Sequence, residues 1–268
     1  MRKAILNLFI CLNECCPNLS IIIINIINII RNKKVRIKSL SNNLCIVVEN
    51  GRKHYFHMKE RAHIYKNGIK DKGRKIANAY MINTIKFNDN DTIIDVGANS
   101  GDLLIYLSDL KKELQVYAFE PDLIAYNSLE KNAASNQNMK IYNIALSDKD
   151  SKESLYISSL GGDTSLSEPE SYDEVVEVNT ERLSTWLSRQ DIDKIKLIKL
   201  EAEGMEPEII KGSEEILSKV EYIAADLGWE RGVNQECTIP DVTNYLLSNN
   251  FKIISVSRDG SRYLFKKS

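Results

Sequence analysis

Short apolar runs alternate with amphipathic segments over most of the chain from residue 91 onward. Five runs have the length and composition of buried strands: residues 92–96, 115–119, 140–144, 196–200 and 222–225. Three other segments have apolar positions at helical spacing: residues 102–110, 123–132 and 239–249. This alternation is typical of a parallel sheet whose strands are connected by helices.

Further β segments are predicted beside this core. Residues 155–159 and 175–179 flank a loop rich in Gly, Ser, Asp and Pro. Residues 252–257 and 262–265 are joined through Asp259-Gly260 and predict a terminal antiparallel pair. We therefore expect an open α/β sheet that binds its ligands beyond the carboxyl ends of the parallel strands.

The first 75 residues follow a different pattern. We expect residues 1–75 to form an extension of helix and short β segments beside a main domain of residues 76–268. The run Ile21–Ile30 contains two asparagines and is half the ~20 residues that a membrane span needs. We expect it to form a helix with a stripe of isoleucines that docks on the main domain or on a second copy of the chain, as in a homodimer. That stripe consists of Ile22, Ile26, Ile29 and Ile30. Because a basic cluster follows the run, peripheral contact with an anionic membrane surface is the alternative.

Charge and cysteine content narrow the classes of function. Thirty-six Lys and Arg residues against 37 Asp and Glu residues leave a formal charge of −1, which offers no basic field to a phosphate backbone. We therefore expect no nucleic acid partner. The five cysteines form no disulfide or zinc framework, and reduced thiols favour a cytoplasmic protein. Three histidines lie between residues 54 and 63 without a recognisable ligand spacing, so no metal site is predicted.

The loop after the first predicted strand is the first candidate site. It reads Asp95-Val96-Gly97-Ala98-Asn99-Ser100-Gly101 and leads directly into a predicted helix. Glycines permit backbone angles and close approaches that a side chain would prevent, and a helix N-terminus presents N–H groups to a polar ligand. The spacing of the glycines matches neither the dinucleotide fingerprint nor the phosphate-binding P-loop.

A second candidate follows the second predicted strand. Glu120-Pro121 lies 25 residues after Asp95. Nucleotide-binding α/β folds place an acid at about this distance, where it accepts hydrogen bonds from ribose hydroxyls. Such an acid repels a 2′-phosphate, which argues against an NADP-type ligand.

Four ordered blocks carry a resemblance to a known family. DVGANSG, AFEP at 118–121, NIALSD at 143–148 and IKLEAEGMEPEIIKG at 198–212 are similar to successive motifs of the FkbM family of S-adenosylmethionine-dependent methyltransferases. The resemblance implies a Rossmann-like fold with a mostly parallel seven-stranded sheet and a C-terminal antiparallel hairpin. It also implies S-adenosylmethionine as the cofactor, with the glycine turn around its methionine and ribose parts and Glu120 as the ribose acid. Asn143, Ala145 and Ser147 are implied at the adenine edge. The family usually has Asp where this chain has Glu201.

Methyl transfer to a hydroxyl requires alignment of the reactants and removal of the hydroxyl proton. Glu201 and Glu203, at the end of the predicted strand 196–200, are the candidate general bases, although the two acids could instead cap the next helix. A divalent ion held by them would be a variant of this hypothesis.

The acceptor site is predicted on segments around the same sheet edge. Its candidate residues are Tyr65, Lys66, Thr164, Ser165, Asp226, Glu230 and Arg231. Thr164 and Ser165 belong to the loop 161–166, which could close as a lid.

The expected activity is methyl transfer to a hydroxyl of a sugar or another polar small molecule. The resemblance implies modification of surface polysaccharides or secondary metabolites. Three alternatives stay open: methylation of a nitrogen, a catalytically inactive binding protein with this fold, and an NAD-dependent oxidoreductase.

Overall fold

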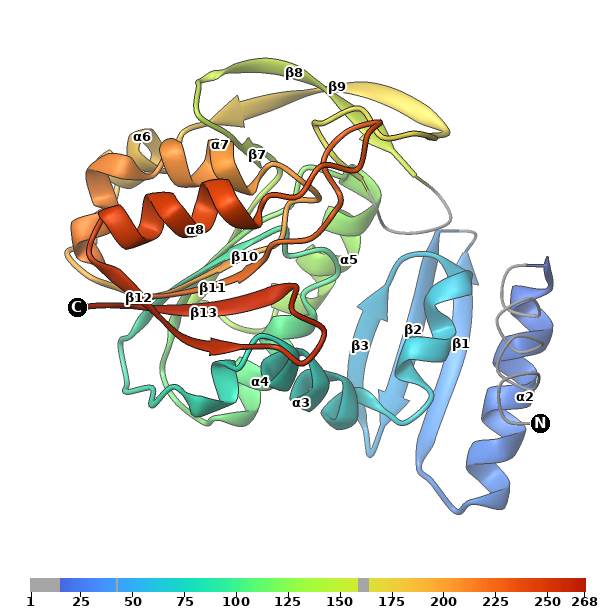
Figure 1. Cartoon of the computed structure of the whole chain (residues 1–268). Helices are drawn as coiled ribbons and strands as arrows, with labels where there is room; N and C mark the ends of the chain where they lie inside the picture. The colour runs from blue at the N-terminus through green and yellow to red at the C-terminus, as the bar shows by residue number, and fades with distance from the viewer. Residues whose placement is uncertain (1–14, 42, 159–163) are drawn as a thin grey trace.

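The computed structural model describes residues 15–41, 43–158 and 164–268, and a seven-stranded sheet lies at its centre (Figure 1). In spatial order its strands are β12 (Phe251–Val256), β13 (Arg262–Lys267), β11 (Val220–Asp226), β10 (Ile195–Leu200), β4 (Thr92–Val96), β5 (Gln115–Phe119) and β6 (Met139–Tyr142). The strands from β11 to β6 are parallel to their neighbours, and β13 is antiparallel to both β11 and β12. The predicted mostly parallel sheet with a C-terminal antiparallel hairpin is confirmed.

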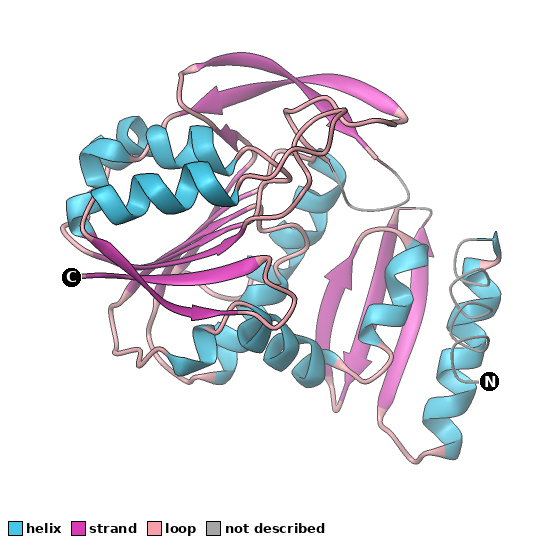
Figure 2. Ribbon diagram, in the orientation of Figure 1, coloured by secondary structure: helices cyan, strands magenta, loops and turns pink. Residues whose placement is uncertain are grey.

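Helices cover both faces of this sheet (Figure 2). One face carries α3 (Ile69–Ala79), α4 (Asp102–Asp109) and α5 (Leu123–Ala133), and the other carries α6 (Leu183–Ser188), α7 (Glu206–Lys211) and α8 (Ile239–Ser248). Short 3₁₀ turns, η2 (Ile82–Thr84) and η3 (Glu214–Lys219), complete the connections. Two apolar cores result, one on each face, because residues of a buried parallel strand alternate between the two faces.

A small second sheet lies above the α6–α8 layer in Figure 1. It consists of β7 (Ala145–Leu146), β9 (Glu174–Glu181) and β8 (Ser151–Ile157), and β8 pairs antiparallel with β9. The β segments predicted at residues 155–159 and 175–179 fall in β8 and β9, and residue 159 lies outside the described residues. The strand predicted at residues 140–144 is present as β6, but it ends at Tyr142 and the chain then enters β7. Asn143 marks the break, because its side chain donates to the carbonyl groups of Glu120 and Pro121, both at 2.9 Å.

The N-terminal part contains helix α2 and a three-stranded sheet. Its elements are α2 (Pro17–Ile30), β1 (Val35–Ser41), β2 (Leu44–Glu49), β3 (Arg52–Phe56) and η1 (Lys59–Tyr65). The boundary expected at residue 75 falls within α3. Ile105 of α4 belongs to the same core cluster as side chains of α2 and β1–β3, so the two parts share a core.

The isoleucine run is helical, but the stripe predicted to dock does not pack on the main domain. Ile22, Ile26, Ile29 and Ile30 are between 49 and 77 % exposed, whereas Ile21 and Ile24 are buried. Asn25 explains the orientation, because its side chain both donates to the carbonyl group and accepts from the amide of Ile37 in β1, at 2.8 Å each. Docking on a second copy and membrane contact stay predictions. Within the described residues, no helix is both long enough and apolar enough to cross a bilayer.

Candidate active site

A cavity of about 240 Å³ opens at the carboxyl ends of β4, β5 and β10. Strand order reverses between β4 and β10. From β4, the sheet continues through β5 and β6 on one side, and through β10 and β11 on the other. Such a switch point is where open α/β sheets bind ligands. The lining residues come from the strand ends, from β7 and β8, from the 164–166 and 201–205 segments, and from η1 and α3.

The glycine turn forms the floor of this cavity. Gly97 has a φ of +66° and passes so close to β10 that a Cβ atom would lie 1.8 Å from the carbonyl oxygen of Glu201. Gly101 has a φ of +82° and begins α4. Asn99 also has a positive φ, +51°. Only glycine fits at residue 97, because any side chain there would displace the neighbouring strand end.

Glu120 lies buried beside this turn at the end of β5. Its two carboxyl oxygens accept hydrogen bonds from the amides of Asn99, at 2.7 Å, and of Asp122, at 3.0 Å. Each oxygen keeps a second lone pair that can accept from a ligand. Burial, reinforced by the neighbouring Asp122, raises the pKa of Glu120 to about 7.

Lys199, in β10, is a site residue that the sequence reasoning missed. Its buried ammonium group contacts Asp95 at 3.3 Å and Glu201 at 2.8 Å, and it donates to the carbonyl group of Gly97 at 2.8 Å. Burial opposes ionisation of Glu201, but the attraction of Lys199 outweighs burial and holds the pKa of Glu201 below its ordinary value. A lysine within the apolar strand sequence KLIKL was the available signal, since a buried lysine requires acidic partners.

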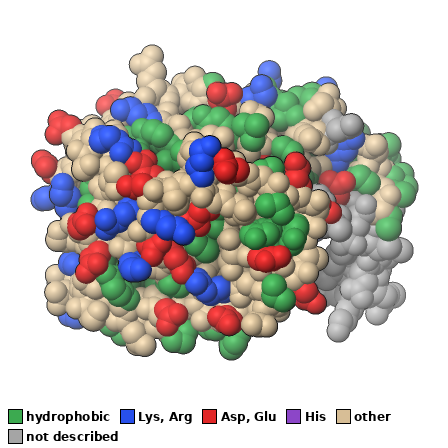
Figure 3. Space-filling model, turned by 90° about the horizontal axis from the view of Figure 1, so that it is seen from above, with side chains coloured by type: hydrophobic (Ala, Val, Ile, Leu, Met, Phe, Trp, Pro, Cys, Tyr) green, Lys and Arg blue, Asp and Glu red, His purple; other side chains and the backbone are tan. Residues whose placement is uncertain are grey.

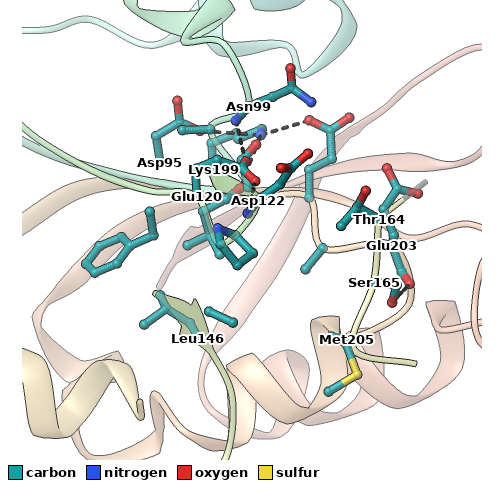
Figure 4. Close-up of a pocket in the computed structure, with 18 of the residues that line it drawn as sticks. Asp95, Asn99, Glu120, Asp122, Leu146, Thr164, Ser165, Lys199, Glu203 and Met205 are labelled. Atoms are coloured by element: carbon teal, nitrogen blue, oxygen red, sulfur yellow. Dashed lines mark hydrogen bonds and ion pairs between the residues drawn. The ribbon is translucent and has the colours of Figure 1, made fainter. Parts of the chain in front are cut away.

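The turn after β10 carries the other candidate base. Glu203 has a φ of +48°, and its carbonyl oxygen accepts from the hydroxyl of Ser165 at 2.7 Å. Glu206 closes the turn, because its carboxylate accepts from the amide of Ala202 at 2.8 Å. Among the described residues, no side chain caps the N-terminus of α7, and Glu201 and Glu203 both line the cavity. In Figure 4, Glu203, Thr164 and Ser165 lie together, apart from Asp95, Lys199 and Glu120.

The predicted cofactor residues divide into two groups. Those that line the cavity are Asp95, Gly97, Ala98, Asn99, Glu120, Pro121 and Ala145. The cavity is not lined by Ser100, Gly101, Asn143 or Ser147. Ser100 bonds through its hydroxyl to the imidazole Nδ1 of His57 at 2.9 Å, and the Asn143 amide braces the chain after β5.

Of the predicted acceptor residues, Thr164 and Ser165 line the cavity and the other five do not. Residues 161–163 of the predicted lid lie outside the described residues. Tyr65 is buried and donates to Asp102 at 2.6 Å, and Lys66 is exposed. Asp226 pairs with Arg262 at 2.6 Å, while Arg231 forms a two-pronged pair with Glu208. Glu230, the fifth of these residues, is exposed on the loop after β11.

The cavity suits S-adenosylmethionine in charge and polarity. Six carboxyl groups line it: Asp95, Asp102, Glu120, Asp122, Glu201 and Glu203. They outnumber the basic side chains Arg61, Lys72 and Lys199, which favours a ligand that carries a sulfonium and an ammonium group. The buried Oδ2 of Asp95 has no hydrogen-bond partner within the described residues, as expected of a group that awaits a ligand. Apolar side chains, among them Phe119, Ile144 and Leu146, offer one end of the cavity to an adenine ring.

No group of three or more His, Cys, Asp or Glu side chains in the described part of the chain has the geometry to hold a metal ion.

Sequence comparison shows which family the chain resembles. Residues 95–253, more than half of the chain, match the family model of the methyltransferase FkbM domain. The 2-O-methyltransferase NoeI of Sinorhizobium fredii is 27 % identical over an alignment of 147 residues, and the match covers 49 % of this chain and 60 % of that protein. This chain thus spans less than two thirds of that relative's length.

Solved structures with a similar arrangement share little sequence with this chain. In the fibrillarin/Nop5p complex, a chain with 15 % identity aligns with a TM-score of 0.48 over 88 % of this chain and 97 % of that one. TrmK of M. capricolum, bound to S-adenosylhomocysteine, has 12 % identity and a TM-score of 0.41 over 72 % of this chain and 66 % of that one. The family match, which begins at Asp95 and contains the blocks of the glycine turn, Glu120 and Glu201, carries the assignment. The chain therefore belongs to the FkbM family of methyltransferases, whose methyl donor is S-adenosylmethionine.

Proposed function

We propose that this protein transfers a methyl group from S-adenosylmethionine to a hydroxyl group of a saccharide or a similarly polar small molecule. The observation that carries the proposal is one cavity that joins Glu120, suited to hold a ribose, to Glu201, suited to receive a proton. The name of NoeI, a 2-O-methyltransferase, supports oxygen as the methylated atom. Modification of a surface polysaccharide or a secondary metabolite is the corresponding proposal for its biological role.

The reaction needs one proton acceptor from the protein. When bound, S-adenosylmethionine supplies an electrophilic methyl group and a neutral thioether leaving group. As the bond from the acceptor oxygen to the methyl carbon forms and the bond from that carbon to sulfur breaks, the hydroxyl proton moves to a carboxylate. The chain also aligns oxygen, carbon and sulfur within a cavity that restricts water.

Glu201 is the carboxylate that we assign as this base. Lys199 keeps Glu201 ionised at neutral pH and fixes one of the Glu201 carboxyl oxygens. The Glu201 side chain is 31 % exposed and lines the cavity. A base needs both a negative charge and access to its substrate. Glu203, on the adjoining turn, is the competing candidate.

Two amide variants decide between these carboxylates. Glu201→Gln is expected to lower kcat by tenfold or more at saturating cofactor, because it cannot accept the proton, whereas Glu203→Gln lowers kcat less. Single-turnover rates measure both effects. If neither variant slows methyl transfer by tenfold, neither carboxylate is the base.

Trp229 supports a saccharide as the acceptor. It is 68 % exposed on the loop between β11 and α8. This loop packs closely on the turn that carries Glu203. The contact is so close that a Cβ atom on Gly204 would lie 2.6 Å from the Cα atom of Arg231. A large exposed ring provides a flat apolar surface for the face of a sugar ring, and the loop of Trp229 adjoins the turn that carries Glu203. Seen from above the view of Figure 1, the surface in Figure 3 has Lys and Arg mixed with Asp and Glu, without a continuous basic patch on that face for nucleic acid.

The proposal is tested with S-adenosylmethionine that carries a ¹³C-labelled methyl group and a panel of mono- and oligosaccharides and small amines. We expect label in an O-methyl ether, identified by its carbon chemical shift. We also expect Trp229→Ala to raise KM for that acceptor without changing cofactor affinity. Label found only on nitrogen, or no transfer to any saccharide, would contradict the proposed acceptor chemistry.

A further inference from the structure

Arg61 is a cavity-lining cation whose charge no acidic side chain neutralises. It lies on η1 and is half-buried. Within the described ranges, no hydrogen bond or ion pair joins its guanidinium group to another residue. The two lysines of the cavity differ in this respect, because Lys72 pairs with Asp102 at 2.9 Å and Lys199 pairs with Asp95 and Glu201. A half-buried arginine without a partner suggests an anionic ligand, since its desolvation is otherwise uncompensated.

Arg61 lies on the side of the cavity that adjoins the glycine turn. His57 connects the two, because its imidazole bonds to the Ser100 hydroxyl and lies close enough to Arg61 for the guanidinium charge to lower the histidine pKa. Burial is the larger cause, and the pKa of His57 is about 3, so its ring is neutral and does not add to the positive charge. Asp102, at the start of α4, lines the same side.

The two ends of the cavity therefore have different chemistry. Glu120 and the apolar side chains of Phe119, Ile144 and Leu146 suit a nucleoside, and the glycine turn leads from them towards Arg61. S-adenosylmethionine has one anionic group, the carboxylate of its methionine part, and this group is at the end opposite the adenine. The many acids of the cavity can neutralise its two cations but not this carboxylate.

We propose that the guanidinium group of Arg61 binds the methionine carboxylate of the cofactor. This inference rests on the proposed function, because it takes the cofactor site as given and adds a residue to it. A guanidinium group matches a carboxylate with two parallel N–H donors, a geometry that an ammonium group lacks. The N-terminal part of the chain thus completes the cofactor site from outside the residues that match the family model.

Calorimetric titration of two ligands tests the assignment. S-adenosylhomocysteine carries the carboxylate, and 5′-methylthioadenosine has the same nucleoside and sulfur without the amino acid. For Arg61→Gln we expect at least a tenfold loss of affinity for S-adenosylhomocysteine and less than a twofold change for 5′-methylthioadenosine. Arg74→Gln is the matched control, because Arg74 is exposed, pairs with Asp71 and does not line the cavity. It is expected to bind both ligands as the unchanged protein does.

Each outcome is decisive. Unchanged affinity of Arg61→Gln for S-adenosylhomocysteine, or an equal loss of affinity for both ligands, overturns the role of Arg61. The proposed function stays intact in that case if the unchanged protein binds S-adenosylhomocysteine. If the unchanged protein binds neither ligand, the proposed function fails and the inference fails with it.

Discussion

Glu120 is an acid at the end of β5 whose ionisation depends on its surroundings. Burial and the adjacent Asp122 favour the neutral form, while the two backbone amides and Lys199 favour the charged form. The balance raises its pKa to about 7, so this carboxyl group titrates at physiological pH. An ionised carboxylate accepts hydrogen bonds from ribose hydroxyls more strongly than a protonated one.

Affinity for S-adenosylhomocysteine should therefore rise with pH around neutrality. Between pH 6 and pH 8 the fraction of ionised Glu120 rises about tenfold at most, and we expect the affinity to rise by up to that factor. His57 does not contribute, because its pKa of about 3 keeps it neutral over this range. Titration calorimetry at three pH values measures the effect. Glu120→Gln should show a flat profile, and a rise that persists in this variant would assign the titration to another group.

At this scale the sequence identified the acids of the site better than their partners. The distance of Glu120 from Asp95 predicted its place, since local strand and turn signals determine both positions. The pairing of Arg231 with Glu208, and of Asp226 with Arg262, depends on contacts between distant elements. Spacing along the chain does not encode such contacts.

At the scale of elements, the site depends on the close approach of β4 and β10. The two strands are in parallel register up to Val96 and Leu200, and the main chain then meets at Gly97 and Glu201. This contact positions both the glycine turn and the candidate base. The apolar patterns predicted the core strands well. They did not predict which face of α2 is buried, because the hydrogen bonds between Asn25 and Ile37 decide that.

Gly97→Ala should separate these strand ends. A Cβ atom would lie 1.8 Å from the Glu201 carbonyl oxygen, and the φ of +66° adds strain. We expect the variant to lose at least ~3 kcal/mol of unfolding free energy, and S-adenosylhomocysteine binding with it. Gly260→Ala is the matched control, because Gly260 has a φ of +80° and no other atom lies within 4 Å of the position that its Cβ would take. It should lose only ~1–2 kcal/mol. If urea unfolding shows equal losses of unfolding free energy for Gly97→Ala and Gly260→Ala, the close approach of Gly97 to Glu201 adds nothing to the cost of the substitution.

At the scale of the whole molecule, Asp102 joins the N-terminal part to the sheet. Its carboxylate accepts from Tyr65 at 2.6 Å and contacts Lys72 at 2.9 Å and His54 at 3.2 Å. Burial opposes its ionisation, but Lys72 and the other partners outweigh burial and hold the pKa of Asp102 well below its usual range. The first 75 residues were expected as an extension beside the main domain because their pattern differs. In the structure, side chains of α2, β1–β3 and η1 share a core with Ile105 of α4, and η1 reaches the cavity.

Asp102→Asn should destabilise the protein by ~3 kcal/mol at pH 7, because it removes a buried carboxylate with three partners and leaves the half-buried Lys72 without its counter-charge. Since the folded-state pKa is lowered, the contribution of Asp102 is fully present above the unfolded-state pKa of about 4 and is lost as pH falls towards the lower folded-state pKa. The deficit of the variant should therefore be constant between pH 7 and pH 5 and shrink below about pH 4.

Urea unfolding over this pH range measures the deficit. Asp109→Asn is the control, because Asp109 pairs with Arg52 across the same junction but both side chains are 36 % exposed, and it should cost less than ~1 kcal/mol. Equal deficits for the two variants, or a deficit of Asp102→Asn that grows in acid, would contradict this account of the junction.

The central claim is that the cavity beside Gly97 and Glu120 binds the adenosine and sulfur-bearing part of S-adenosylmethionine. Calorimetric titration of the unchanged protein and of Glu120→Ala with S-adenosylhomocysteine, and of the unchanged protein with NAD, tests it most directly. We predict binding of S-adenosylhomocysteine, no binding of NAD, and a loss of ~1–3 kcal/mol of binding free energy in a folded Glu120→Ala variant. Failure to bind S-adenosylhomocysteine, binding of NAD in its place, or unchanged affinity of the folded variant would contradict the claim.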